Sequence, residues 1–170
     1  MPSIYTRTRR SRIADIVVFA VIVLVILAVL RFLPRPEPVR LSGHAQVIDG
    51  DSLVLQGAEL RLKGIDAPEA AQECMRSGKS WPCGRAAARA LAARLRAKTV
   101  ICSGNERDAH DRLLATCKVG SLDVNKWLVE QGWAVSFHGF PAEESSARAA
   151  KRGIWAGPFM RPREWRELNQ

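Results

Sequence analysis

The feature that most constrains this chain is an unbroken run of fifteen apolar residues over positions 16–30. A helix needs about twenty residues to cross the hydrocarbon core of a membrane. Residues 13–33 reach that length if Asp15 and Arg31 lie at the two interfaces, where the long Arg stem can extend to the headgroups. We therefore expect residues 13–33 to form a transmembrane signal-anchor.

Four arginines precede the apolar run and indicate its orientation. Because basic flanks stay in the cytoplasm, residues 1–12 are expected there, with the domain on the periplasmic or extracellular side of the cytoplasmic (inner) membrane. These arginines are Arg7, Arg9, Arg10 and Arg12. A cleaved secretory signal is the competing interpretation, but a bulky, charged, proline-rich segment follows in place of a small-residue cleavage site. A buried helix of a soluble protein would leave the arginine cluster unexplained.

The overall charge does not by itself identify a partner. The formal net charge is +9, from 26 Lys and Arg against 17 Asp and Glu. Residues 1–40 hold seven of the arginines and only two acidic residues, so more than half of the excess flanks the apolar run. Residues 41–170 are only weakly basic for a polyanion binder. A nucleic-acid interpretation therefore has to rest on individual side chains.

The four cysteines, Cys74, Cys83, Cys102 and Cys117, fit an extracytoplasmic domain. No Cys-x-x-Cys pair and no histidine at zinc-finger spacing accompany them, so a structural zinc site is not expected. In an oxidising compartment two disulfides are the default. Three pairings are open, and 74 with 83 plus 102 with 117 is the simplest because each would close one short loop. Four free buried thiols are the alternative.

Beyond the apolar run, the pattern predicts a proline-rich linker over 34–40, one domain over 41–160 and a C-terminal tail over 161–170. Strands are expected at 46–48, 52–55, 60–63, 99–102, 113–119 and 133–137. Helices are expected at 82–98, from an N-cap at Asp123 to Gly132, and from Pro141 to about Gly153. Strands first, helices interleaved and no long βαβ alternation indicate an α+β domain around a small barrel.

Carboxylates gather around the first expected hairpin. A turn centred near Gly57 would bring Asp51 opposite the neighbourhood of Asp66, and the proline-fixed turn at 66–69 adds a further carboxylate. Arg61 stands a few residues upstream on the same strand. Hard oxygen ligands suit Ca²⁺ or Mg²⁺. A carboxylate that does not coordinate the metal can activate water, and guanidinium groups can bind a phosphate. Ordinary turn carboxylates are the alternative, which the joint spacing with Arg61 disfavours.

Four segments resemble the staphylococcal-nuclease-like (thermonuclease) family in order and spacing. They are residues 47–52 (VIDGDS), 61–69 (RLKGIDAPE), 107–115 (RDAHDRLLA) and 153–155 (GIW). The resemblance implies an OB-fold, a five-stranded β-barrel with about three helices. It also implies a hydrolase, a Ca²⁺-dependent endonuclease that cleaves phosphodiester bonds of DNA and RNA and leaves 3′-phosphate ends.

The resemblance further implies roles for six residues. Two carboxylates and one backbone carbonyl would bind Ca²⁺, another carboxylate would be the general base, and two guanidiniums would hold the scissile phosphate. In that order, these residues are Asp51, Asp66, Ala67, Glu69, Arg61 and Arg112.

Departures from the family pattern motivate a second hypothesis. His110 and Asp111 precede Arg112 where the family usually has Tyr-Gly, and the nucleotide-facing loop is short, with Phe137 and His138 in place of tyrosines and lysine. Phe137 and His138 can still stack on bases, and His110 is a candidate donor to phosphate. The alternative function is a nucleic-acid- or protein-binding module with weak or no catalysis. A monomer is expected in either case.

Overall fold

The computed structural model describes residues 9–33 and 37–169, and the chain divides into two compact units after Pro36. Residues 1–8, 34–36 and 170 lie outside the described part. The expected basic N-terminus falls largely there, as do Pro34 and Pro36 of the expected linker.

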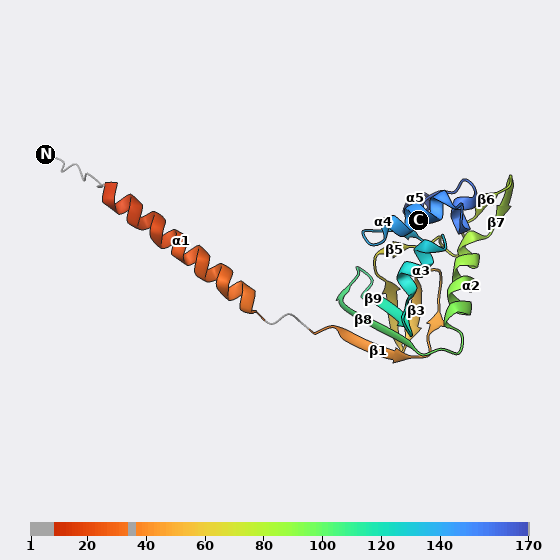
Figure 1. Ribbon diagram of the computed structural model, residues 1–170, viewed down its shortest axis with the longest axis horizontal. Helices are drawn as coiled ribbons and strands as arrows, with labels where there is room; N and C mark the ends of the chain where they lie inside the picture. Colours follow the sequence, from red (N-terminus) through yellow and green to blue (C-terminus); the bar gives the residue numbers. More distant parts are fainter. Residues whose placement is uncertain (1–8, 34–36, 170) are drawn as a thin grey trace. The chain divides into compact units, whose positions relative to one another are not determined.

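The first unit contains helix α1 (Arg9–Phe32). Its stretch Ala14–Phe32 is long and apolar enough to cross a membrane, and none of it is buried within the protein (Figure 1). A helix that is apolar on every side requires an apolar surrounding, because no single stripe distinguishes a core face. The expected apolar helix is confirmed, and its length and composition fit a membrane span or a signal sequence.

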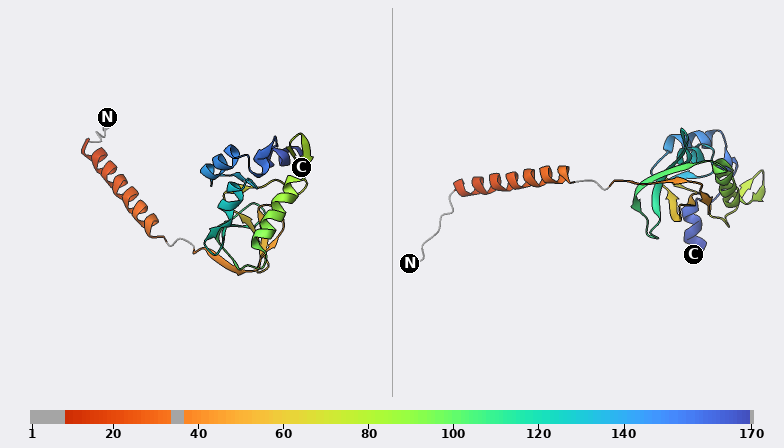
Figure 2. Two further views of the ribbon diagram at one scale, coloured as in Figure 1. Left: turned by 45° about the vertical axis from the view of Figure 1, so that its right-hand side comes forward. Right: turned by 90° about the horizontal axis from the view of Figure 1, so that it is seen from below.

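The second unit is built on one curled, seven-stranded sheet (Figures 1 and 2). Its strands are β1 (Val39–Gly43), β2 (Gln46–Val47), β3 (Ser52–Leu55), β4 (Ala58–Leu62), β8 (Val100–Arg107), β9 (Leu113–Val119) and β10 (Leu122–Asp123). The order is β1-β8-β9-β4-β3-β2, with β10 paired to β9. Only the β4–β9 pairing is parallel among the described strands of this sheet.

Smaller elements adjoin this sheet. Two short antiparallel pairs join β5 (Ile65–Asp66) to β11 (Val135–Ser136), and β6 (Cys74–Arg76) to β7 (Lys79–Trp81). The helices are α2 (Cys83–Leu95), α3 (Val124–Glu130), α4 (Pro141–Ala149), the 3₁₀ turn η1 (Gly153–Ala156) and α5 (Pro162–Asn169). In Figure 1, α4, α5, β6 and β7 lie above the strands of the sheet, and α2 runs alongside them. The α+β fold is confirmed, and α5 adds a fourth α-helix to the three expected in the domain.

Alternation along the first hairpin decides which side chains reach the core. Leu60 and Leu62 of β4 are buried in the main hydrophobic core, to which α2 contributes Leu91 and Leu95. The residue between the two β4 leucines therefore points to the other face of the sheet. That residue is Arg61, which the fold thus directs away from the core.

The turn of this hairpin fixes its register. Gln56 and Gly57 form a two-residue connection in which both φ angles are positive, at 53° and 78°. This is the backbone of a type I′ turn, whose twist matches that of the flanking strands. Asp51 lies one position before β3 and its carbonyl accepts a hydrogen bond from Leu62 N–H at 2.8 Å. Asp51 is thus placed at the end of the hairpin opposite the turn.

The two disulfides are confirmed in the simplest of the three possible pairings. Cys74 in β6 is bonded to Cys83 at the start of α2, and Cys102 is bonded to Cys117 across β8 and β9. All four residues are buried. The first bond ties the β6–β7 hairpin to α2, and the second lies inside the main core.

Candidate active site

A tight loop presents Asp51 at the edge of the sheet. Asp49 Oδ1 accepts hydrogen bonds from the backbone N–H groups of Asp51 and Ser52, at 3.0 and 2.8 Å, which folds the chain back on itself. Gly50 allows this loop to approach the next one, because a Cβ there would lie 2.6 Å from the Cβ of Ala67. Asp51 Oδ2 in turn accepts a hydrogen bond from Ala67 N–H at 2.9 Å.

Asp66 and Glu69 come from the turn that Asp51 contacts. Asp66 ends β5, whose pairing with β11 fixes its position, and it is 4% exposed, as is Asp51. Pro68 lies between Asp66 and Glu69, and Glu69 is partly exposed. The fully buried Gln72 closes the turn, since its N–H donates to Glu69 O at 2.8 Å and its Oε1 accepts from Glu69 N–H at 3.2 Å.

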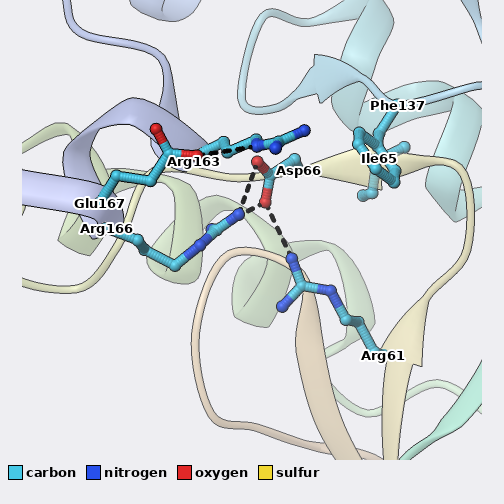
Figure 3. A pocket seen from close by; sticks show the side chains of 7 residues that line it. All are labelled: Arg61, Ile65, Asp66, Phe137, Arg163, Arg166 and Glu167. Carbon is cyan, nitrogen blue, oxygen red and sulfur yellow. Dashed lines mark hydrogen bonds and ion pairs between the residues drawn. The ribbon is translucent and has the colours of Figure 1, made fainter. Parts of the chain in front are cut away.

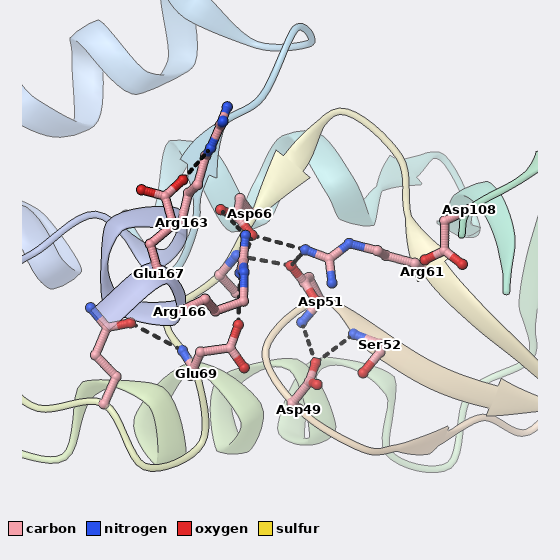
Figure 4. A network of polar contacts seen from close by, with 12 residues as sticks. Asp49, Asp51, Ser52, Arg61, Asp66, Glu69, Asp108, Arg163, Arg166 and Glu167 are labelled. Atoms are coloured by element: carbon pink, nitrogen blue, oxygen red, sulfur yellow. Dashed lines mark hydrogen bonds and ion pairs between the residues drawn. The ribbon is translucent and has the colours of Figure 1, made fainter. Parts of the chain in front are cut away.

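Arg61 joins the two buried carboxylates. Its Nη2 lies 3.0 Å from Asp51 Oδ2 and 2.8 Å from Asp66 Oδ1, so one nitrogen contacts both side chains (Figure 4). Burial raises the pKa of Asp51 to about 7, and the nearby Arg61 only partly offsets this effect. Removal of this carboxylate from water is thus the largest influence on its pKa, and the neighbouring charges of Asp49 and Asp66 add to it.

Arg166 of α5 is the functional candidate that the sequence reasoning missed. Its Nη1 and Nη2 contact Asp66 Oδ1 and Oδ2 at 3.0 and 3.1 Å, and Nη1 also lies 2.7 Å from Glu69 Oε1. These hydrogen bonds, above all those with Asp66, raise the pKa of Arg166. Pro162 at the first helical position and Glu164 in the first turn were signals for a helix here. No local signal indicated which surface that helix would contact.

In the part of the chain that the structure describes, Arg112 and His110 form no hydrogen bond or ion pair with Asp51, Asp66 or Glu69, although the charge of Asp51 helps to raise the pKa of Arg112. Arg112 Nε and Nη2 both contact Asp108 Oδ2, at 2.8 and 2.7 Å, in the loop before β9. Burial alone would raise the pKa of Asp108, but the hydrogen bonds from Arg112 and from backbone N–H groups outweigh it and lower that pKa. His110 is exposed in the same loop. Neither Arg112 nor His110 lines either of the two cavities at the site.

Two neighbouring cavities adjoin the carboxylates. The first, of about 380 Å³, is lined by Arg61, Ile65, Asp66, Phe137, Arg163, Arg166 and Glu167 (Figure 3). The second, of about 480 Å³, shares Arg61, Ile65 and Phe137 with the first and extends past His138 and Phe140. The ring centroids of Phe137 and His138 are 4.7 Å apart in an edge-on arrangement. The two expected stacking residues therefore lie beside the carboxylate site.

The donor set fits a hard divalent cation. The buried carboxylates of Asp51 and Asp66 both contact one nitrogen of Arg61. The metal ligands that they offer are oxygen atoms, which Ca²⁺ and Mg²⁺ prefer. Within the described residues, no three His, Cys, Asp or Glu side chains form a metal-binding group on their own. A cation here would therefore need further oxygen ligands, such as a backbone carbonyl or solvent.

Comparison with known proteins defines the class of protein to which this site belongs. Residues 59–157 match the model of the staphylococcal nuclease homologue family, which covers more than half of the chain. The chain belongs to this family. The matched stretch contains Arg61, Asp66, Glu69 and Arg112, whereas Asp51 and Arg166 lie outside it.

Two curated proteins are also similar to the chain. One is the succinoglycan biosynthesis protein ExoI of Rhizobium meliloti (strain 1021), which is 35% identical over 127 residues. The other is the probable staphylococcal-like nuclease CAN1 of Oryza sativa subsp. japonica, which is 25% identical over 134 residues. The alignments cover 70% and 74% of this chain but only 65% and 38% of the relatives. The chain thus spans less than two thirds of either relative.

Proposed function

We propose that this protein is a membrane-anchored, extracytoplasmic Ca²⁺-dependent nuclease that hydrolyses phosphodiester bonds of DNA and RNA and leaves 3′-phosphate ends. The observation that carries the proposal is the convergence of Asp51, Arg61, Asp66 and Glu69 into one network of ion pairs, of which Arg61 and Asp66 line the first cavity. Membership of the nuclease family supports it.

The proposed mechanism assigns one task to each group. Asp51 and Asp66 would hold Ca²⁺ with the Ala67 carbonyl, and the bound ion would supply positive charge that polarises the phosphate. Glu69 is more exposed than either aspartate, so water can reach it, and it takes the proton of the attacking water. Arg61 stabilises the negative charge that develops on the phosphate oxygens. The bond from phosphorus to the 5′ oxygen then breaks, and the leaving 5′ oxygen takes a proton from solvent to become a hydroxyl.

Other features of the chain support a location for the proposed nuclease. We propose that α1 is an uncleaved single-pass anchor in the cytoplasmic membrane, with the basic N-terminus inside and the nuclease domain outside. The unburied apolar stretch of α1 and the two disulfides of the domain support this placement. We also propose that the protein acts as a monomer, because the residues proposed for catalysis all come from one chain.

A cleavage assay on the full chain in detergent micelles tests the proposed reaction. End-labelled single-stranded DNA is expected to be degraded with Ca²⁺ and to stay intact with EGTA, because the carboxylates need the cation to receive phosphate. The fragments should change mobility after phosphatase treatment, as 3′-phosphate ends require. Binding of DNA without Ca²⁺, and no cleavage at high protein concentration, would instead support the alternative function of a binding module. The ion pair between Arg112 and Asp108 favours this alternative, because it holds Arg112 away from a phosphate.

A further inference from the structure

Two guanidinium groups contact the same carboxylate in the candidate site. Arg61 of β4 and Arg166 of α5 both lie within 3.0 Å of Asp66 Oδ1 (Figure 3). Each also contacts a second carboxylate, since Arg61 reaches Asp51 and Arg166 reaches Glu69. Each arginine thus bridges two carboxylates: Arg61 contacts Asp51 and Asp66, and Arg166 contacts Asp66 and Glu69.

Both guanidiniums also face the same open space. Arg61 and Arg166 line the cavity of about 380 Å³, together with the ring of Phe137. Arg61 makes both carboxylate contacts through Nη2, and within the described residues its Nη1 and Nε have no hydrogen-bond partner. A guanidinium carries five N–H donors. The cavity thus offers N–H donors from the positively charged Arg61 and Arg166, beside the ring of Phe137, on which a base can stack.

Arg112 cannot fill this role in the conformation seen. Its Nε and Nη2 are both engaged by Asp108, and it does not line the cavity. Freeing it would break a partly buried ion pair whose two side chains are 19% and 17% exposed. Arg163 also lines the cavity, but its Nε is paired with Glu167 Oε1 at 3.0 Å and its side chain is 71% exposed. Of the arginines that line this cavity, Arg61 and Arg166 are the two that contact the candidate-site carboxylates.

The position of Arg166 is fixed by contacts distant in sequence. The buried Gln72 donates from Nε2 to Met160 O at 2.6 Å, while its Oε1 accepts from Glu69 N–H. Arg161 Nη2 lies 2.9 Å from Glu144 Oε1 of α4, which holds the start of α5. One buried side chain thus links the turn that carries Glu69 to the segment that carries Arg166.

We propose that Arg61 and Arg166 together bind the phosphate of the substrate, with Arg166 as the second phosphate-binding guanidinium. This inference rests on the proposed nuclease function. A phosphodiester has two unesterified oxygens, which suit paired guanidinium donors better than a single ammonium. A cation held by Asp51 and Asp66 would weaken their contacts with the two arginines, which leaves Glu69 as the remaining carboxylate partner of Arg166 and frees N–H donors of both arginines for the phosphate.

Affinity measurements in a cleavage-impaired background test the proposal. The full chain carrying Glu69→Gln is mixed with fluorescent single-stranded DNA in Ca²⁺, and Kd is read by anisotropy. Adding Arg166→Gln is expected to weaken binding about tenfold or more, as loss of charged hydrogen bonds to phosphate requires. Arg166→Lys should recover part of the loss, because it keeps the charge without the planar fork. A circular dichroism spectrum checks that each variant is folded.

Two further variants separate the possible failures. Arg96→Gln removes the same charge at the far end of α2, and its Kd should change little. Arg61→Gln should weaken binding whether or not Arg166 takes part. If Arg61→Gln weakens binding while Arg166→Gln binds as tightly as the parent or tighter, Arg166 only competes for the carboxylates and the proposal is overturned. If the Glu69→Gln chain without further substitutions binds no DNA in Ca²⁺, the proposed nuclease function is contradicted together with this inference.

Discussion

Replacing Glu69 with glutamine is expected to lower the cleavage rate about one hundred to ten thousandfold, the usual contribution of a general base. The amide cannot accept the proton of the attacking water. It keeps an oxygen that can still accept from Arg166 Nη1, which now lies 2.7 Å from Glu69 Oε1, so the fold should be preserved. The turnover number of the full chain on single-stranded DNA, at saturating Ca²⁺, measures the effect.

Glu130→Gln is the matched control for this substitution. Glu130 is exposed at the end of α3, and its change removes the same charge without touching the cavity residues. Its turnover number should equal that of the parent. A Glu69→Gln protein that is folded and cuts as fast as this control would contradict the assignment of Glu69 as the base.

Replacing Gly84 with alanine is expected to destabilise the domain by about 3 kcal/mol, the upper end for overpacking in a close-packed site. Gly84 lies in the first turn of α2, directly against the backbone of the turn that carries Glu69. A Cβ at this position would be 1.7 Å from the carbonyl oxygen of Glu69 and 3.2 Å from Cα of Ala70. Backbone atoms cannot rotate away as a flexible side chain can, so the helix and the turn must separate.

The same substitution should also impair cleavage, because separating α2 from the turn moves Glu69. Thermal unfolding of the full chain is expected to show a midpoint lowered by about 10 °C. Gly43→Ala is the control, since its Cβ would lie 3.6 Å from Leu55 Cδ1, an ordinary contact distance. Equal midpoints for Gly84→Ala and Gly43→Ala would show that the close packing of α2 on this turn is not present in solution.

Local sequence signals predicted the parts of the fold that depend on near neighbours. Asp123 caps α3 through a hydrogen bond from Lys126 N–H to its side chain, and Gly132 has the positive φ of 70° expected after that helix. The i, i+4 positions Ala87, Leu91 and Leu95 are all buried. In these segments the apolar spacing and the terminal residues point to the same structure, so no distant contact is needed to decide it.

Elements that depend on distant contacts were not predicted, or were predicted with different limits. β1 begins at Val39, inside the expected linker, because residues 39–43 pair with β8. β8 itself extends to Arg107, five residues beyond the expected end at Cys102, as a register shift between Ser103 and Glu106 lets it continue along β9. Such pairings join residues far apart in sequence, so their lengths are set by the partner strand.

The residues of the candidate site also divide into those placed by near neighbours in the sequence and those placed by distant contacts. The spacing of Asp51, Arg61, Asp66 and Glu69 was enough to predict that they converge, because one hairpin and one turn carry them all. Arg166 lies about a hundred positions away from Arg61 in the chain, and its helix is held at the site by contacts distant in sequence, those of Gln72 with Met160 and of Arg161 with Glu144. The family resemblance pointed to Arg112, whose partner Asp108 is four residues earlier in the same loop.

The Ca²⁺ dependence of cleavage by the full chain, compared with its Asp66→Asn variant, tests the central claim most directly. Asparagine keeps an oxygen to accept from Arg61 but removes the charge that would bind the cation. We predict cleavage by the parent that saturates with Ca²⁺ and stops in EGTA, and a variant that needs far more Ca²⁺ and cuts much more slowly. Cleavage by the parent that persists in EGTA, or a folded variant with an unchanged Ca²⁺ requirement, would contradict the account.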